Sequence, residues 1–184
     1  MCASIPTSRA SASALSSVVG ALARLDLELL ANARTLAHSE ERDRAVARFS
    51  ALGEHAGVWL VMGAAASLVA TGEQRRRWRA ATGLVAGAYV LNSALKLAVG
   101  RRRPELPELP PLVGTPTGLS FPSAHATTSF AAASLYSRLG APPVPLYALA
   151  ASLAASRVYL GVHYPSDVLA GAALGSALAA LAPR

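Results

Sequence analysis

The sequence predicts an all-α, integral-membrane helical bundle, with about five spanning helices preceded by amphipathic N-terminal helices. Hydrophobic residues make up 53% of the 184 residues and charged residues only 15%, whereas soluble domains carry roughly 25% charged residues. The apolar residues fall in long runs without the alternation of β-strands. The length suits a single domain with a sizeable core.

The charge pattern narrows the possible partners. The formal net charge is +7, and most of the excess is arginine at the edges of apolar runs. Aromatic residues are only 5% and are not interleaved with these cations, as base stacking on nucleic acid would require. The composition therefore argues against nucleic-acid binding and favours anionic lipid head groups and phosphates. The single cysteine, Cys2, excludes an internal disulfide and a cysteine-based metal cluster.

The N-terminal third divides into two parts. Residues 1–15 are rich in serine and alanine and lack the long apolar core of a signal peptide, which predicts a disordered leader. Residues 16–54 are predicted to form amphipathic, interfacial helices, because leucines at helical spacing alternate with charges in 16–32 and a cap signal at Ser39 opens a second polar helix before Gly53. Residues 55–184 form the predicted membrane-embedded domain.

Five apolar helices are expected in that domain, over residues 56–70, 80–99, 124–139, 144–161 and 165–181. Several are shorter than the roughly 20 residues that cross an ordinary bilayer, so flanking residues or local thinning must make up the difference. Two Gly-x-x-x-Gly motifs, Gly83 with Gly87 and Gly171 with Gly175, favour close helix contact, although alanine-rich runs also produce such pairs by chance. The proline-rich stretch 101–122 is predicted to be a loop that covers a site.

Ionisable residues at the ends of these helices are functional candidates, because charge is expensive in a membrane. If consecutive spans alternate in direction, they all gather on one side: Lys96, Arg101, Arg102, Arg103, His125, Arg157, His163 and Asp167. Each has a simpler interpretation when taken alone. Lysine and arginine anchor helices at interfaces, a histidine can cap a helix, and an aspartate in a first turn favours the helix dipole.

Their order along the chain nevertheless matches the needs of phosphoryl transfer. Lys96 and Arg103 are two helical turns apart, and Pro104 ends the helix there. Pro122 opens the next helix, whose free N–H groups at Ser123, Ala124 and His125 predict an anion seat.

A second group of residues supplies a nucleophile. His163 precedes a helix that begins near Pro165, and Asp167 follows four residues after the histidine. A carboxylate on one imidazole nitrogen fixes the tautomer and leaves the other nitrogen free to attack. Arg157 adds a third cation and His125 a proton donor, so that charge neutralisation, nucleophile and acid are all present.

These residues resemble the signature of the type-2 phosphatidic acid phosphatases, which share a phosphate pocket with the vanadium haloperoxidases. Lys96 and Arg103-Pro104 match the first part, Lys-x6-Arg-Pro. Residues 122–125 match Pro-Ser-Gly-His with Ala124 in place of glycine, and Ser156-Arg157, His163 and Asp167 match Ser-Arg-x5-His-x3-Asp. The resemblance extends from about residue 56 to the end.

The resemblance implies a role for each matched residue. His163 attacks phosphorus, Asp167 orients it, and His125 protonates the departing alcohol before water hydrolyses the phosphohistidine. The phosphate is held by Lys96, Arg103, Arg157, Ser123 and the N–H of Ala124. The family needs no metal or other cofactor. Arg101 and Arg102 match no signature position and are interpreted as a solvated charge run, or as contacts to a second phosphate or head group.

The expected activity is hydrolysis of a phosphomonoester or diphosphate of a polyprenyl lipid or glycerolipid. Short length, polar N-terminal helices and Ala/Arg-rich composition resemble the small actinobacterial members, which makes decaprenylphosphoryl-5-phosphoribose, used in cell-wall arabinan synthesis, the leading substrate. Undecaprenyl diphosphate and phosphatidylglycerophosphate are the alternatives. A non-catalytic lipid-binding or transport bundle is a rival, as is a haem protein with two histidine ligands, against which Arg157 argues.

The expected location is a bacterial cytoplasmic membrane, but the positive-inside rule gives opposite orientations. Arginines 75, 76, 77 and 79, placed in the loop between the first two spans, would direct the site outward. Arginines 34, 42, 44 and 48, on the side of the site, would direct it inward.

Overall fold

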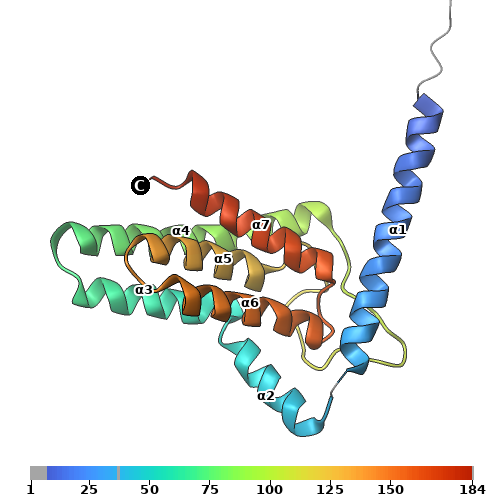
Figure 1. Ribbon diagram of the computed structural model, residues 1–184, viewed down its shortest axis with the longest axis horizontal. Helices are drawn as coiled ribbons and strands as arrows, with labels where there is room; N and C mark the ends of the chain where they lie inside the picture. Colours follow the sequence, from blue (N-terminus) through green and yellow to red (C-terminus); the bar gives the residue numbers. More distant parts are fainter. Residues whose placement is uncertain (1–7, 37, 184) are drawn as a thin grey trace, which may run out of the picture.

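The computed structural model describes residues 8–36 and 38–183, and these residues fold almost entirely into helices (Figure 1). The elements are α1 (Ser8–Thr35), α2 (Glu40–Ala51), the short 3-10 helix η1 (Glu54–Ala56), α3 (Gly57–Val69), α4 (Gly72–Val99), α5 (Ala124–Arg138), α6 (Pro143–Tyr159) and α7 (Pro165–Leu181). The described residues contain no strand, only an isolated bridge between Arg102 and Leu119. The all-α prediction is confirmed.

The five C-terminal helices lie where the sequence places them, but two helix starts differ from the prediction. Helix α4 begins at Gly72 rather than near residue 80, so the arginines at 75–79 lie in its first turns and not in a loop. Helix α1 begins at Ser8, inside the segment predicted to be a disordered leader. The rest of that leader, residues 1–7, lies outside the described residues.

Membrane spanning is most evident in α4. It is the one single helix of residues 8–36 and 38–183 that is long and apolar enough to cross a bilayer, with 28 residues and a mean hydropathy of 1.3 over its most apolar stretch. Helix α2 and the segment η1–α3 pass the same criterion together but are bent by 48°. Large apolar side chains are nevertheless exposed on other helices, including Val61, Leu68, Val144, Leu169 and Leu181. Such side chains suit lipid contact, and the number of spans stays a prediction.

Helix α5 lies at the centre of the bundle, packed against α4, α6 and α7. Most of its alanines, threonines and serines are buried, because small side chains allow close approach of several neighbours. The indole of Trp59 donates to Ser129 Oγ at 2.8 Å, and the hydroxyl of Tyr136 donates to the carbonyl of Trp59 at 2.8 Å. These bonds join α3 to α5 in a core that satisfies its polar groups.

The two Gly-x-x-x-Gly motifs behave differently. A methyl group at Gly171 would contact the Ser123 carbonyl, and one at Gly175 would overlap the Thr127 carbonyl, so this pair marks the close α5–α7 contact. A methyl group at Gly83 or Gly87 would meet nothing within 4 Å. The Gly171–Gly175 motif is therefore a packing motif, and the Gly83–Gly87 motif faces open space.

Gly175→Ala should destabilise the bundle, because backbone on α5 would have to move away from α7. We expect a loss of about 1–3 kcal/mol, typical of an overpacked contact, seen as a lower thermal unfolding temperature in detergent. Gly87→Ala is the matched control and should leave that temperature unchanged or raise it slightly, since alanine favours helix. Equal unfolding temperatures for the two variants would contradict the α5–α7 contact.

The N-terminal helices attach to one end of the bundle, where α1 crosses it at a steep angle (Figure 1). Arg34 of α1 is buried and donates through Nη2 to the carbonyl of Pro110 at 2.8 Å. Residues 101–122 fold back on themselves at the same end, where the N–H of Ser120 donates to the carbonyl of Arg101 at 2.8 Å. Loop and N-terminal helices thus cover the end where α4 stops and α5 begins.

Candidate active site

A cavity of about 200 Å³ opens at this end of the bundle. Six of the predicted site residues line it, from the end of α4, the proline-rich loop, the start of α5, the end of α6 and the α6–α7 turn: Lys96, Arg103, Ala124, His125, Arg157 and His163. Ser123 and Asp167 are fully buried directly behind the lining. The structure therefore brings together residues that are far apart in the chain, as the alternation of helices predicts.

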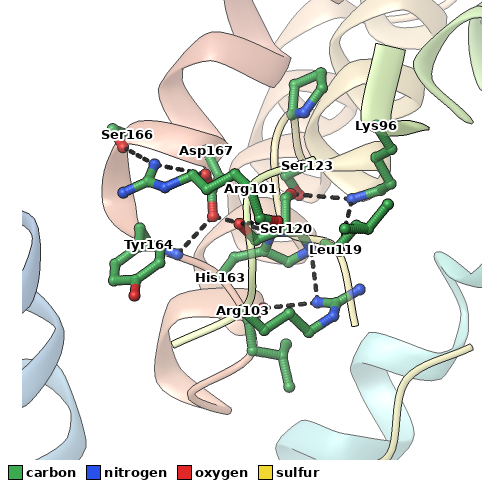
Figure 2. Close-up of polar contacts among 12 residues, drawn as sticks. Lys96, Arg101, Arg103, Leu119, Ser120, Ser123, His163, Tyr164, Ser166 and Asp167 are labelled. Atoms are coloured by element: carbon green, nitrogen blue, oxygen red, sulfur yellow. Dashed lines mark hydrogen bonds and ion pairs between the residues drawn. The ribbon is translucent and has the colours of Figure 1, made fainter. Parts of the chain in front are cut away.

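The state of His163 follows from its neighbours (Figure 2). Arg103 Nη1 lies 3.2 Å from His163 Nε2. Because a guanidinium only donates, Nε2 must be the nitrogen with the free lone pair. Burial lowers the pKa of His163 to about 3 despite the opposing effect of Asp167, so the imidazole is neutral. The protonated Nδ1 lies 3.4 Å from Asp167 Oδ2, longer than an ordinary hydrogen bond.

Asp167 is fixed by the start of α7. Pro165 occupies the first turn, and Asp167 Oδ2 accepts from the N–H of Tyr164 at 2.9 Å in a capping box. The carbonyl of Asp167 accepts from the N–H of Ser123 at 3.0 Å. That donor is therefore occupied, and its predicted place in the anion seat is wrong. The Ser123 hydroxyl is buried and has no hydrogen bond within the described part of the chain.

Ala124 stands where the Pro-Ser-Gly-His signature has glycine, and its backbone is not strained. It is the first residue of α5, with ordinary helical geometry, and it lines the cavity. Asn92 of α4 secures this helix start by donating to the Pro122 carbonyl at 3.3 Å and to Thr127 Oγ1 at 2.9 Å. Alanine at this position is therefore compatible with a helix N-terminus that faces an anion.

Backbone carbonyls and a hydroxyl hold the three cations in place. Lys96 Nζ donates to the carbonyl of Ser120 at 2.9 Å, and Arg103 Nη1 donates to that of Val162 at 2.6 Å. Arg157 is only 3% exposed, and its Nη1 donates to Ser50 Oγ at 2.7 Å. Burial, and then repulsion from Arg157, lower the pKa of Arg103 to about 10, so it stays charged at neutral pH.

The cavity is strongly electropositive. Among its described lining residues, Glu54 is the one carboxylate opposite Lys96, Arg103 and Arg157, and its Oε1 lies 3.9 Å from Arg157 Nη1. Buried charges of one sign are unfavourable unless a partner arrives. A phosphate dianion, which accepts several charge-assisted hydrogen bonds, suits such a cavity.

The α2–α3 connection also reaches the site, which sequence reasoning missed. His125 Nε2 lies 3.0 Å from the carbonyl of Ser50, and since a carbonyl only accepts, Nε2 carries a proton. His55 and Ala56 line the cavity with φ angles of 51° and 62°, a left-handed conformation that is costly for these residues and is often found at functional sites. Nothing in the spacing of residues 50–56 indicates this contact.

Comparison with known proteins identifies a matching family and similar relatives. The family model described as the PAP2 superfamily matches residues 76–184. A relative from Mycobacterium tuberculosis, named decaprenylphosphoryl-5-phosphoribose phosphatase, is 41% identical over 156 residues, covering 83% of this chain and 78% of the relative. A relative of the same name from Mycolicibacterium smegmatis is 44% identical over 131 residues, covering 70% and 68%.

A solved structure agrees with the fold. The crystal structure of Aquifex aeolicus LpxE superimposes with a TM-score of 0.69 and 25% identity, covering 85% of this chain and 93% of the other. The all-α bundle of this chain is thus shared with that structure. This chain belongs to the PAP2 superfamily, and the predicted family is confirmed.

Proposed function

We propose that this protein is a membrane lipid phosphatase that acts through a phosphohistidine at His163. The observation that carries the mechanism is a neutral imidazole in a cavity with three cations, with its unprotonated Nε2 accepting a hydrogen bond from Arg103. A phosphate bound to those cations would place phosphorus within reach of this nitrogen. Lipid phosphatase activity agrees with the names of the mycobacterial relatives.

The first step transfers the phosphoryl group to the protein. The Nε2 lone pair of His163 forms the phosphorus–nitrogen bond while the bond to the lipid-side oxygen breaks. His125, which takes up a proton when the phosphate dianion binds beside it, gives that proton to the leaving oxygen. Asp167 accepts the charge-assisted hydrogen bond from Nδ1 as the ring becomes cationic, and the 3.4 Å contact should shorten at that point. Lys96, Arg103 and Arg157 neutralise the equatorial oxygens, so no metal ion has to do so.

The second step returns the protein to its starting state. Neutral His125 takes a proton from water, the water oxygen bonds to phosphorus, and the phosphorus–nitrogen bond breaks to release inorganic phosphate. The Nε2 lone pair is then free again. His125 ends protonated and His163 neutral, so the two steps balance.

For the substrate we propose decaprenylphosphoryl-5-phosphoribose, which both mycobacterial relatives have in their name. The proposed location is a bacterial cytoplasmic membrane, where a polyprenyl lipid resides. Apolar residues of α4 such as Leu97 line the cavity next to Lys96, so a lipid chain and a phosphate can be accommodated together. Undecaprenyl diphosphate and phosphatidylglycerophosphate remain the alternative substrates for the same cavity.

Phosphate release from a panel of these three lipids, measured with purified protein in detergent and in the presence of EDTA, tests the proposal. We expect release with EDTA present, fastest from the phosphoribosyl lipid. Faster release from either other lipid would replace the substrate assignment, and activity that appears only when Mg²⁺ is restored would contradict the metal-independent mechanism. Lipid binding without release from any substrate would favour a non-catalytic binding or transport protein.

A further inference from the structure

Arg101 is not part of a solvated charge run (Figure 2). Its Nη1 donates to Asp167 Oδ1 at 2.8 Å, and its Nη2 lies 2.8 Å from Asp26 Oδ2. The guanidinium also lies over the ring of Tyr164, 4.1 Å from its centroid. Its neighbour Arg102 is exposed. Of the two arginines that precede Arg103, Arg101 is thus the one fixed between two carboxylates, and one of these belongs to the proposed catalytic pair.

Asp26 is the partner that comes from outside the bundle. It lies on α1 and is only 7% exposed, and its Oδ1 accepts from the N–H of Ser166 in the first turn of α7 at 2.9 Å. The Ser166 hydroxyl donates to Asp26 Oδ2. Burial raises the pKa of Asp26, but hydrogen bonds from Arg101 and Ser166 outweigh this and hold the pKa below its ordinary value. Asp26 is therefore ionised at neutral pH.

This arrangement affects the charge that His163 experiences. Asp167 uses Oδ1 for Arg101 and has Oδ2 on the side of His163. An unopposed guanidinium on Oδ1 would withdraw negative charge from the carboxylate and weaken its support of an imidazolium ring. Asp26 shares that guanidinium, so Asp167 keeps more of its charge for His163. The partner of a catalytic group commonly tunes it in this way.

We infer that Asp26 and Arg101 are positioning residues for the Asp167–His163 pair, and that α1 is thereby part of the catalytic unit. The inference rests on the proposed phosphohistidine mechanism and extends it. Asp26 lies well before residue 76, where the family match starts. The chain from Asp26 through Arg101 and Asp167 to His163 joins an N-terminal helix to the nucleophile.

Single-turnover formation of the phosphoenzyme tests this inference in full-length protein. Asp26→Asn should slow this step about tenfold, as loss of an outer-shell partner commonly does, with KM unchanged within about twofold because no phosphate ligand is lost. Asp26→Glu should recover part of the rate. Glu28→Gln, an exposed carboxylate on the same helix, is the matched control and should behave like the unmodified protein.

A double-mutant cycle separates this role from simple destabilisation. Arg101→Met should also slow the step, because Asp167 loses the hydrogen bond that fixes its Oδ1. Adding Asp26→Asn to it should slow the step little further, because Asp26 acts through Arg101. Fully additive effects, or an Asp26→Asn rate equal to that of an active unmodified protein, would overturn the inference.

The imidazole signals give a readout independent of turnover. The chain has only four histidines, so ¹⁵N-histidine spectra are simple, and His163→Ala identifies the signal of the nucleophile. Asp26→Asn should move the His163 Nδ1 resonance and Glu28→Gln should not. An unmoved His163 resonance in Asp26→Asn would overturn the inference, whether or not the unmodified protein releases phosphate. Absence of phosphate release from the unmodified protein would refute the proposed function alone.

Discussion

His163→Ala is expected to lower phosphate release by at least about a thousandfold, because a covalent route cannot proceed without its nucleophile. The unprotonated Nε2 of His163 lies in the cavity beside Arg103, where a bound phosphate would meet it. Turnover of the lipid substrate measures the loss. Trapping of an acid-labile phosphoenzyme, present in the unmodified protein and missing in the variant, assigns it to the covalent step.

The variant should stay folded and keep its three phosphate-binding cations, because each of them retains a hydrogen bond to another group when the imidazole is removed. Vanadate, a trigonal-bipyramidal analogue of the transferred phosphoryl group, should inhibit the unmodified protein and raise the unfolding temperature of both proteins. If His163→Ala retained turnover within tenfold of the original while folded, another nucleophile would have to be sought.

Arg157→Gln should produce the second largest loss, about a hundredfold in kcat/KM, similar to removal of one preorganised donor from a transition-state site. Within the described residues, the buried guanidinium has Ser50 Oγ and a distant Glu54 as partners, and it repels Arg103. Removing a cation from this crowded group should therefore leave the unfolding temperature unchanged or raise it. Functional sites often store such unfavourable charge.

The exposed Arg102 provides the matched control. Arg102→Gln should keep both activity and the vanadate-induced rise in unfolding temperature, whereas Arg157→Gln should lose most of that rise. A normal vanadate effect in Arg157→Gln would show that Arg157 does not bind the anion. Thermal unfolding in detergent, with and without vanadate, distinguishes these outcomes.

The convergence of the site residues could be predicted because it depends on where each helix begins and ends, which neighbouring residues in the sequence indicate. Prolines and small residues mark the helix ends, and alternation of helix direction then puts Lys96, His125, Arg157 and His163 at one end of the bundle. The start of α4 was missed because four arginines within five residues indicate a loop in a membrane protein, although arginine is a good helix former.

The contacts of the N-terminal helices were not predictable by the same means. Ser50 and Asp26 belong to polar helices without a periodic relation to the site, and only the docking of α1 and α2 brings them to Arg157 and Arg101. Asn92 did carry a signal. A lone amide within an apolar span is costly unless it is hydrogen-bonded, and here it holds the start of α5.

The lining of the cavity has a consequence for the fate of the two products. The lining includes the apolar side chains of Leu97 and Ala56 as well as Pro116 and Thr117 of the covering loop. In the proposed reaction, the dephosphorylated lipid would diffuse sideways into the hydrocarbon phase, while the small anion would leave past the loop into water. Because the two products would enter different solvents, they would not recombine. Dilution alone would then make hydrolysis of the lipid phosphate effectively irreversible.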